Sequence, residues 1–190
     1  FSKMIFIILS AIIYFIPNLW VNYTLNKHDD VLSNMPFTAK EFGEELLKEK
    51  GLNDVKIETT KDGDHYDLID KAVRVEPSRL DKKSLTSITV MCHEIGHAIQ
   101  HREKYPPLER RYKITKVTNL ITRLSTVIAY IGIPAIIATG VFPLIRVCLI
   151  VVFASILISM IIHLMTLDVE LDASFKRAMP ILEKKIPQEY

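Results

Sequence analysis

This sequence contains few cysteines, carries little net charge and shows no internal repeat. Its 190 residues include two cysteines and carry a net charge of +2. Cys92 lies in a predicted helix and Cys148 in a long apolar run, so we expect no disulfide between them and interpret Cys92 as a small core residue. The small net charge argues against nucleic acid as a partner. No repeat or low-complexity segment is visible, which argues against a repeat architecture.

Hydrophobic residues, in contrast, are abundant and make up 49% of the chain. They concentrate in three runs, at residues 4–23, about 120–139 and about 144–165. Each run is long enough for a transmembrane helix, which needs about 20 predominantly apolar residues. Four residues, 140–143, separate the second run from the third. We therefore predict a transmembrane helical hairpin over residues 118–165, because soluble helices are rarely so uniformly apolar.

The first apolar run is either a retained anchor or a signal peptide. Lys3 precedes its apolar part, as in a signal peptide. However, no cleavage site with small residues follows, and Trp20 and Tyr23 are typical of a helix end at a membrane interface. We therefore expect residues 4–23 to be an N-terminal transmembrane anchor. The chain starts with Phe1 instead of Met, so further residues are expected upstream.

The most informative motif is H-E-I-G-H at residues 93–97, inside a predicted helix over residues 84–101. Because residues four apart share one face of a helix, His93 and His97 can direct two imidazole nitrogens at one zinc ion. Glu94 beside them is the expected catalytic residue, a general base that activates water. The alternative is a buried helix with two hydrogen-bonded structural histidines, which would need partners because unpaired polar groups in a core are costly.

A catalytic zinc usually has three protein ligands. The metzincin pattern would require histidine where Glu103 stands, so it does not apply. Glu170, which follows the third apolar run, is the predicted third ligand beside His93 and His97. Asp172 lies on another face of that helix and is expected to hydrogen-bond near the metal site or to cap the helix. The alternative is that these acids are solvated groups at a helix N-terminus.

The segment over residues 24–117 is predicted to form a soluble zincin-like domain. Thr38 and Glu41 have capping-box spacing, which predicts a helix that runs to about Lys50. Alternation of apolar and polar residues then predicts three short strands that form a small antiparallel sheet. These strands cover residues 55–60, 65–69 and 72–75. The helix with the H-E-x-x-H motif follows, and a C-terminal helical segment over residues 166–190 carries Glu170, so the expected fold class is an α+β membrane protein.

The strand over residues 72–75 is nearest in sequence to the helix with the histidines. As a sheet edge it could bind an extended peptide by strand addition and present a carbonyl group to the metal. The alternative is that this strand belongs to the interior of the sheet.

The flanking basic residues predict the orientation in the membrane. They precede the second apolar run and follow the third, on the side that holds residues 93–97 and Glu170, whereas the turn of the hairpin offers only Arg146. We therefore expect a multi-pass protein of the cell membrane whose site faces the cytoplasm. The basic residues are Arg110, Arg111, Lys113, Lys116, Lys176, Arg177, Lys184 and Lys185.

Three stretches resemble the bacterial membrane-bound neutral zinc metallopeptidases of the YugP type, which are gluzincin-like H-E-x-x-H proteases: H-E-I-G-H-A-I-Q at 93–100, H-Y-D at 65–67 and V-E-L-D-A-S at 169–174. The Glu-x-x-Ala spacing is also similar to that of HtpX-like membrane metallopeptidases. The resemblance implies zinc bound by His93, His97 and Glu170, with Glu94 catalytic. Family members commonly carry a further apolar span near the C-terminus, so the resemblance leaves open whether this chain is a fragment.

The predicted function is that of a hydrolase, a zinc metalloendopeptidase that cleaves peptide bonds at the cytoplasmic membrane surface. We expect Zn²⁺ as cofactor, peptide or protein substrates that include membrane proteins, contact with lipid, and no nucleic acid. Oligomeric state does not follow from the sequence. The alternative is a non-catalytic zinc-binding membrane scaffold or subunit, whose closed site would need a fourth protein ligand such as Asp168 or His65. Candidate donors to an oxyanion are His65, Tyr66, Tyr105 and Tyr112.

Overall fold

The computed structural model describes residues 16, 17, 19–141 and 143–187. Most of the anchor predicted over residues 4–23 lies outside the described residues, and its described part belongs to a helix that continues to residue 27. The chain divides into two compact units. The first comprises the residues up to Ile99 together with those from Phe175 onward, and the second comprises Gln100–Ser174.

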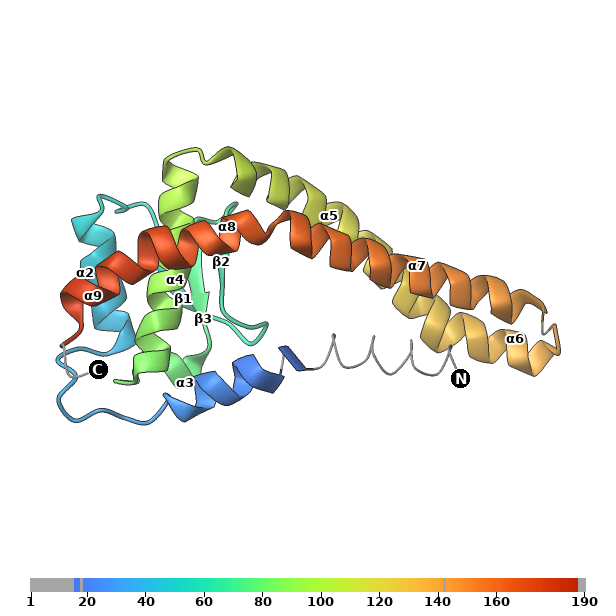
Figure 1. Cartoon of the computed structure of the whole chain (residues 1–190), viewed down its shortest axis with the longest axis horizontal. Helices are drawn as coiled ribbons and strands as arrows, with labels where there is room; N and C mark the ends of the chain where they lie inside the picture. Colours follow the sequence, from blue (N-terminus) through green and yellow to red (C-terminus); the bar gives the residue numbers. More distant parts are fainter. Residues whose placement is uncertain (1–15, 18, 142, 188–190) are drawn as a thin grey trace. The chain divides into compact units, whose positions relative to one another are not determined.

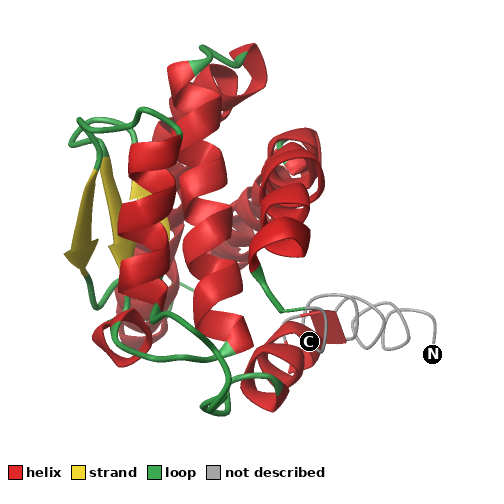
Figure 2. Ribbon diagram, turned by 90° about the vertical axis from the view of Figure 1, so that its left-hand side faces the viewer, coloured by secondary structure: helices red, strands yellow, loops and turns green. Residues whose placement is uncertain are grey.

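The first unit combines several helices with a small sheet, which forms a layer on one side of the helices (Figure 2). Figure 1 labels these elements along the chain. They are α2 (Ala39–Glu49), β1 (Lys56–Thr59), β2 (His65–Asp67), β3 (Ala72–Val75), α3 (Pro77–Leu80), most of α4 (Leu85–Arg102) and α9 (Met179–Lys185).

Helix α2 begins where the capping-box spacing predicts. The Thr38 N–H donates to Glu41 Oε2 at 2.8 Å, and the Glu41 N–H donates to Thr38 Oγ1 at 3.2 Å. Side chains thus satisfy two backbone donors that would otherwise lack partners at the helix start. At the other end, Gly51 has a φ of 67°, a left-handed conformation that glycine adopts at little cost. These local signals confirm the predicted helix.

The sheet is mixed, so the predicted antiparallel sheet is wrong for one of its two strand pairs. The strand order is β1-β3-β2, in which β1 runs parallel to β3 and β2 antiparallel to it. Strand β3 occupies the centre because it is the most apolar strand, with Ala72, Val73 and Val75 all at 0% exposure. Both of its edges are therefore paired, and the prediction that residues 72–75 form a free edge for a peptide is wrong.

A hydrophobic core joins α2, α4 and the sheet. Phe42 of α2, Val73 of β3 and Ile88 and Ile95 of α4 are buried in one cluster. Helix α2 comes close to α4 at Gly43, where an added Cβ would lie only 2.8 Å from a side-chain atom of α4. This packing fixes one face of α4 in the core of the first unit.

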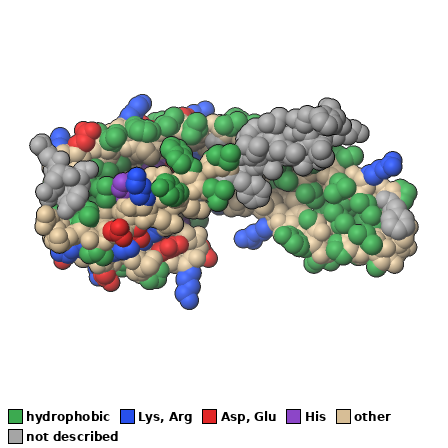
Figure 3. All heavy atoms as spheres, turned by 60° about the horizontal axis from the view of Figure 1, so that its bottom comes forward, with side chains coloured by type: hydrophobic (Ala, Val, Ile, Leu, Met, Phe, Trp, Pro, Cys, Tyr) green, Lys and Arg blue, Asp and Glu red, His purple; other side chains and the backbone are tan. Residues whose placement is uncertain are grey.

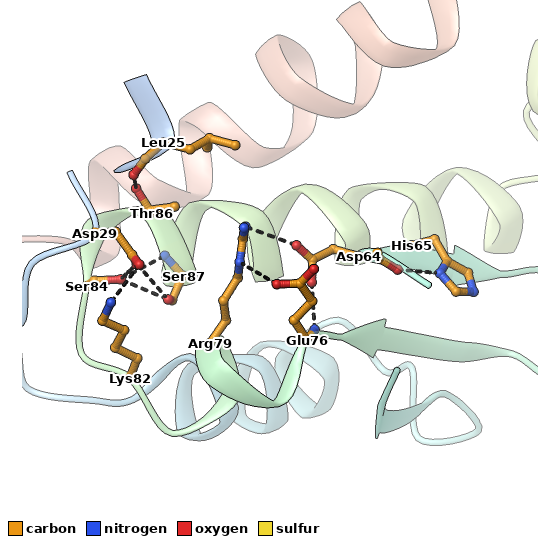
Figure 4. A network of polar contacts seen from close by, with 11 residues as sticks. Leu25, Asp29, Asp64, His65, Glu76, Arg79, Lys82, Ser84, Thr86 and Ser87 are labelled. Carbon is orange, nitrogen blue, oxygen red and sulfur yellow. Dashed lines mark hydrogen bonds and ion pairs between the residues drawn. The ribbon is translucent and has the colours of Figure 1, made fainter. Parts of the chain in front are cut away.

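The start of α4 is tied to the end of the N-terminal helix and to the residues that follow it (Figure 4). Asp29 accepts hydrogen bonds from Ser84 Oγ at 2.7 Å and from Lys82 Nζ at 2.6 Å. Thr86 Oγ1 donates to the carbonyl oxygen of Leu25 at 2.7 Å. The polar contacts therefore link residues 25–29 to the first turn of the helix that carries the H-E-x-x-H motif.

The second unit contains long apolar helices. Two helical segments are joined by a turn at Gly140, which has a φ of 73°. The helices before the turn pack against the helix after it. The elements are α5 (Pro106–Val127), the π-helical η1 (Ile128–Gly132), α6 (Ile133–Thr139), α7 (Pro143–Met165), α8 (Leu167–Leu171) and the first part of the π-helical η2 (Asp172–Ala178).

Among the described residues, two helical stretches are long and apolar enough to cross a membrane, Pro106–Thr139 and Pro143–Lys185. In the most apolar window of each, only 6% of the residues are buried. Hydrophobic side chains accordingly gather on the visible face of the α6–α7 end (Figure 3). A helix that exposes apolar side chains in this way matches a membrane span better than the buried core helix of a soluble protein.

Candidate metal centre

The H-E-x-x-H motif lies within α4, which spans Leu85–Arg102. The Nε2 atoms of His93 and His97 are 3.2 Å apart, and the two rings are nearly perpendicular, with an interplanar angle of 83°. Two imidazole nitrogens that bind one zinc ion tetrahedrally at about 2.0–2.1 Å would be about 3.3 Å apart. The observed pair therefore fits the geometry of a shared metal ion.

The site residues of α4 sit in a mostly buried environment. His97 is 5% exposed and Glu94 is 7% exposed, while His93 is half-buried. The apolar face of the same helix is anchored in the core through Met91 and Ile95, both at 0% exposure. Packing on that face holds the backbone that carries the two imidazoles, so their convergence does not depend on a flexible loop.

Cys92 is a core residue and not a further ligand candidate. It is fully buried, and its Sγ lies 3.6 Å from the carbonyl oxygen of Ala178. Burial raises the pKa of the Cys92 thiol to about 12. A buried thiol of this kind stays protonated at neutral pH and behaves as a small hydrophobic side chain. The interpretation of Cys92 as a small core residue is confirmed.

Glu170 belongs to the second unit, where it lies in the short helix α8. It is half-buried, and its Oε1 lies 2.5 Å from Nη1 of Arg111, a residue of α5. Asp168, the proposed fourth ligand of a structural site, lies in the first turn of α8 and accepts a hydrogen bond from the Val169 N–H at 2.9 Å.

Gln100 is a residue that the sequence analysis did not include in the site. Its side chain is fully buried, and its Nε2 donates to the carbonyl oxygen of Val169 at 2.9 Å and to Asp172 Oδ2 at 2.8 Å. The amide of Gln100 is thus one hydrogen-bond partner of Asp172. The signal available in the sequence was spacing, because Gln100 follows His97 by three residues and therefore shares its side of α4.

The candidate oxyanion donors lie in different surroundings. Tyr66 belongs to the hydrophobic core, where burial raises the pKa of its hydroxyl to about 12. His65 Nδ1 lies 2.8 Å from the carbonyl oxygen of Gly63, at the turn before β2. Tyr112 lies under the ammonium group of Lys116, which is 4.7 Å from the ring centroid. These contacts do not assign the oxyanion role to any of them.

Comparisons with known proteins relate the whole chain to one protein family. Residues 3–189 match the protein family described as "Putative neutral zinc metallopeptidase". A protein of Bacillus subtilis (strain 168), "Putative membrane protease YugP", is 31% identical over 164 residues, which are 85% of this chain and 69% of the relative. No solved structure matches the chain.

Proposed function

Because this chain belongs to the neutral zinc metallopeptidase family, we propose that it is a membrane-bound zinc metallopeptidase that hydrolyses peptide bonds at the cytoplasmic surface of the membrane. The observation that carries this proposal is the convergence of two imidazole nitrogens, 3.2 Å apart, on one turn of α4. Two such nitrogens fill half of a tetrahedral zinc shell. Their chemistry agrees with the metal that the family description names.

We propose His93, His97 and Glu170 as the zinc ligands. Two imidazoles and one carboxylate are donor types that could hold a metal ion, and three protein ligands leave a position open for water, as catalytic zinc sites require. Bound zinc would polarise the scissile carbonyl group and make water more acidic. Arg111, which contacts the Glu170 carboxylate, would orient that side chain for binding.

Glu94 is the proposed catalytic residue. It follows His93 directly in α4, so it is held beside the imidazole pair, and its carboxylate is largely shielded from solvent, at 7% exposure. In the proposed reaction this carboxylate accepts a proton from the water that attacks the peptide carbonyl carbon. The same carboxyl group then delivers the proton to the departing amine nitrogen, so that Glu94 is ionised again after each cycle.

The membrane location rests on the second unit. The two candidate spans expose most of their apolar side chains, which would be unfavourable in water. Basic residues flank these spans on the sides of Arg111 and Lys176, and by the positive-inside rule those ends face the cytoplasm. We propose that the substrates are peptides or proteins, membrane proteins among them, that reach the site from that face.

The proposal is tested with full-length protein in detergent or nanodiscs, by metal analysis combined with cleavage of casein. The wild type should bind one zinc ion per chain and cleave casein. Glu94→Gln should keep the zinc but lose activity by about 10²–10⁴-fold, because it cannot accept a proton. Glu44→Gln, which changes an exposed acid of α2, is the matched control and should remain active.

Three results would contradict the proposal. A wild type without zinc or a Glu94→Gln variant with full activity would remove the metallopeptidase mechanism. Stoichiometric zinc in a wild type that cleaves no casein or other unfolded protein would instead favour the non-catalytic scaffold.

A further inference from the structure

Gln100 is a fully buried polar side chain that the proposed reaction does not use. Its Nε2 lies 2.9 Å from the Val169 carbonyl oxygen and 2.8 Å from Asp172 Oδ2. A primary amide is neutral and carries two N–H donors on one nitrogen, so Gln100 serves both acceptors at once. Glutamate at this position could only accept, and methionine would provide neither donor. The contacts therefore explain why an amide side chain suits this position.

The two acceptors bracket Glu170 in the chain, since Val169 precedes it and Asp172 follows it by two residues. Helix α8 has only 5 residues and continues directly into the 7-residue π-helix η2. Both are parts of the longer helical stretch Pro143–Lys185, and π-helical turns are frequent at functional sites. The two bonds from Gln100 thus provide fixed points on either side of Glu170.

Gln100 also shares a helix face with the two histidines. It follows His97 by three residues and His93 by seven, which places it about 60° and about 20° from them around the α4 axis. One face of one helix therefore carries both imidazoles and the amide that holds residues 169 and 172.

We propose that Gln100 is a positioning residue that places the Glu170 carboxylate for metal binding. This inference rests on the zinc site proposed above. Gln100 acts on the backbone at Val169 and on Asp172, whereas Arg111 contacts the Glu170 carboxylate directly. Loss of the amide therefore leaves all three metal ligands in the chain but weakens the binding of zinc through Glu170.

The test measures the zinc dissociation constant of the full-length protein by competition with a chromogenic chelator. Gln100→Met, which keeps the length of the side chain, should weaken zinc binding by about 10–100-fold, the range typical when groups that support the metal ligands are removed. Ile88→Val is the matched control, because it disturbs a buried residue of α4 without touching these bonds, and its zinc affinity should stay within about twofold of the wild type.

A double-mutant cycle separates positioning from a general loss of structure. In a Glu170→Gln background, Gln100→Met should change zinc affinity by less than about twofold, since the carboxylate through which it acts is gone. As a second measurement, hydrogen exchange of the zinc-free protein should show faster exchange at residues 169–174 in Gln100→Met. Asp172→Ala removes one of the two acceptors of Gln100 and is used if the methionine variant does not fold. It should weaken zinc binding by more than the roughly twofold limit set by the control.

These experiments distinguish a failure of the proposed function from a failure of the role proposed for Gln100. A wild type that binds no zinc would overturn both the proposed function and this inference. Unchanged zinc affinity in Gln100→Met, or an equal loss in the wild-type and Glu170→Gln backgrounds, would overturn only the role of Gln100. Unchanged hydrogen exchange at residues 169–174 would do the same.

Discussion

Replacing Asp29 by alanine tests whether the polar network at the start of α4 supports the first unit. The Asp29 carboxylate accepts hydrogen bonds from Ser84 Oγ at 2.7 Å, from Ser87 Oγ at 3.4 Å and from Lys82 Nζ at 2.6 Å. Both serines are fully buried. The variant removes the shared acceptor, so their hydroxyl groups lose a charged partner in a place where water cannot easily replace it.

The expected loss of stability is about 2 kcal/mol. A hydrogen bond from a buried hydroxyl to a charged group contributes about 1.5–3 kcal/mol. The ion pair adds little, because its Lys82 and Asp29 side chains are 28% and 29% exposed and solvent screens the attraction. For a chain of this size, about 2 kcal/mol lowers the melting temperature by about 4–8 °C.

The effect should also depend on pH. Burial raises the pKa of Asp29, but the hydrogen bonds from Lys82 and Ser84 outweigh it and hold the pKa below its usual range. A carboxylate with a lowered pKa in the folded state stabilises the protein above its unfolded pKa of about 3.9, and this contribution is lost as the pH falls through the folded pKa. The difference in stability between the wild type and Asp29→Ala should therefore be largest near pH 6 and should shrink below about pH 4.

The assay is thermal unfolding of the detergent-solubilised protein, followed by circular dichroism at a fixed scan rate. Asp30→Ala, at the exposed neighbouring position, is the matched control and should change the melting temperature by less than about 1 °C. A melting temperature for Asp29→Ala that equals that of the control, or a difference that persists unchanged at pH 3, would refute the argument.

Three further predictions follow from the described contacts. Thr38→Ala should destabilise the protein by about 1 kcal/mol through loss of the capping box, whereas Thr38→Ser should retain most of the stability in the same unfolding assay. In a Cys148→Ser background, Cys92 should resist iodoacetamide at pH 8 until the protein unfolds, because its thiol is buried with a pKa near 12; rapid labelling of the native protein would contradict this. In a cysteine-free background, Val141→Cys in the hairpin turn should react with an impermeant maleimide added outside intact cells, and protection there combined with labelling from the cytoplasm would reverse the proposed orientation.

Local sequence signals predicted several elements of the fold correctly. The Thr38–Glu41 spacing predicted the start of α2, and its end lies one residue before the expected Lys50. Strands β1, β2 and β3 lie within the three predicted segments, although each assigned strand is as long as its prediction or shorter. Capping, turn residues and alternating hydrophobicity act over a few residues, so their effect can be read from the chain without knowledge of distant contacts.

The order of the strands could not be predicted in the same way. Strand β3 lies between β1 and β2, so the strand that follows both in sequence separates them in the sheet. Alternation along a strand indicates which side chains face the core, but not which neighbour each edge pairs with. The fully buried Val73 and Val75 favour the central position only once the helices that cover the sheet are known.

At the candidate metal centre, too, local patterns and distant contacts carry different information. Spacing along one helix placed the imidazoles of His93 and His97 together, because the helical repeat fixes the direction of residues four apart. The partners of Gln100 lie about seventy residues away, at Val169 and Asp172, and no periodic pattern connects such distant positions. Those contacts follow from packing, since the amide finds its acceptors only after the long apolar helices have folded back and brought the two segments side by side.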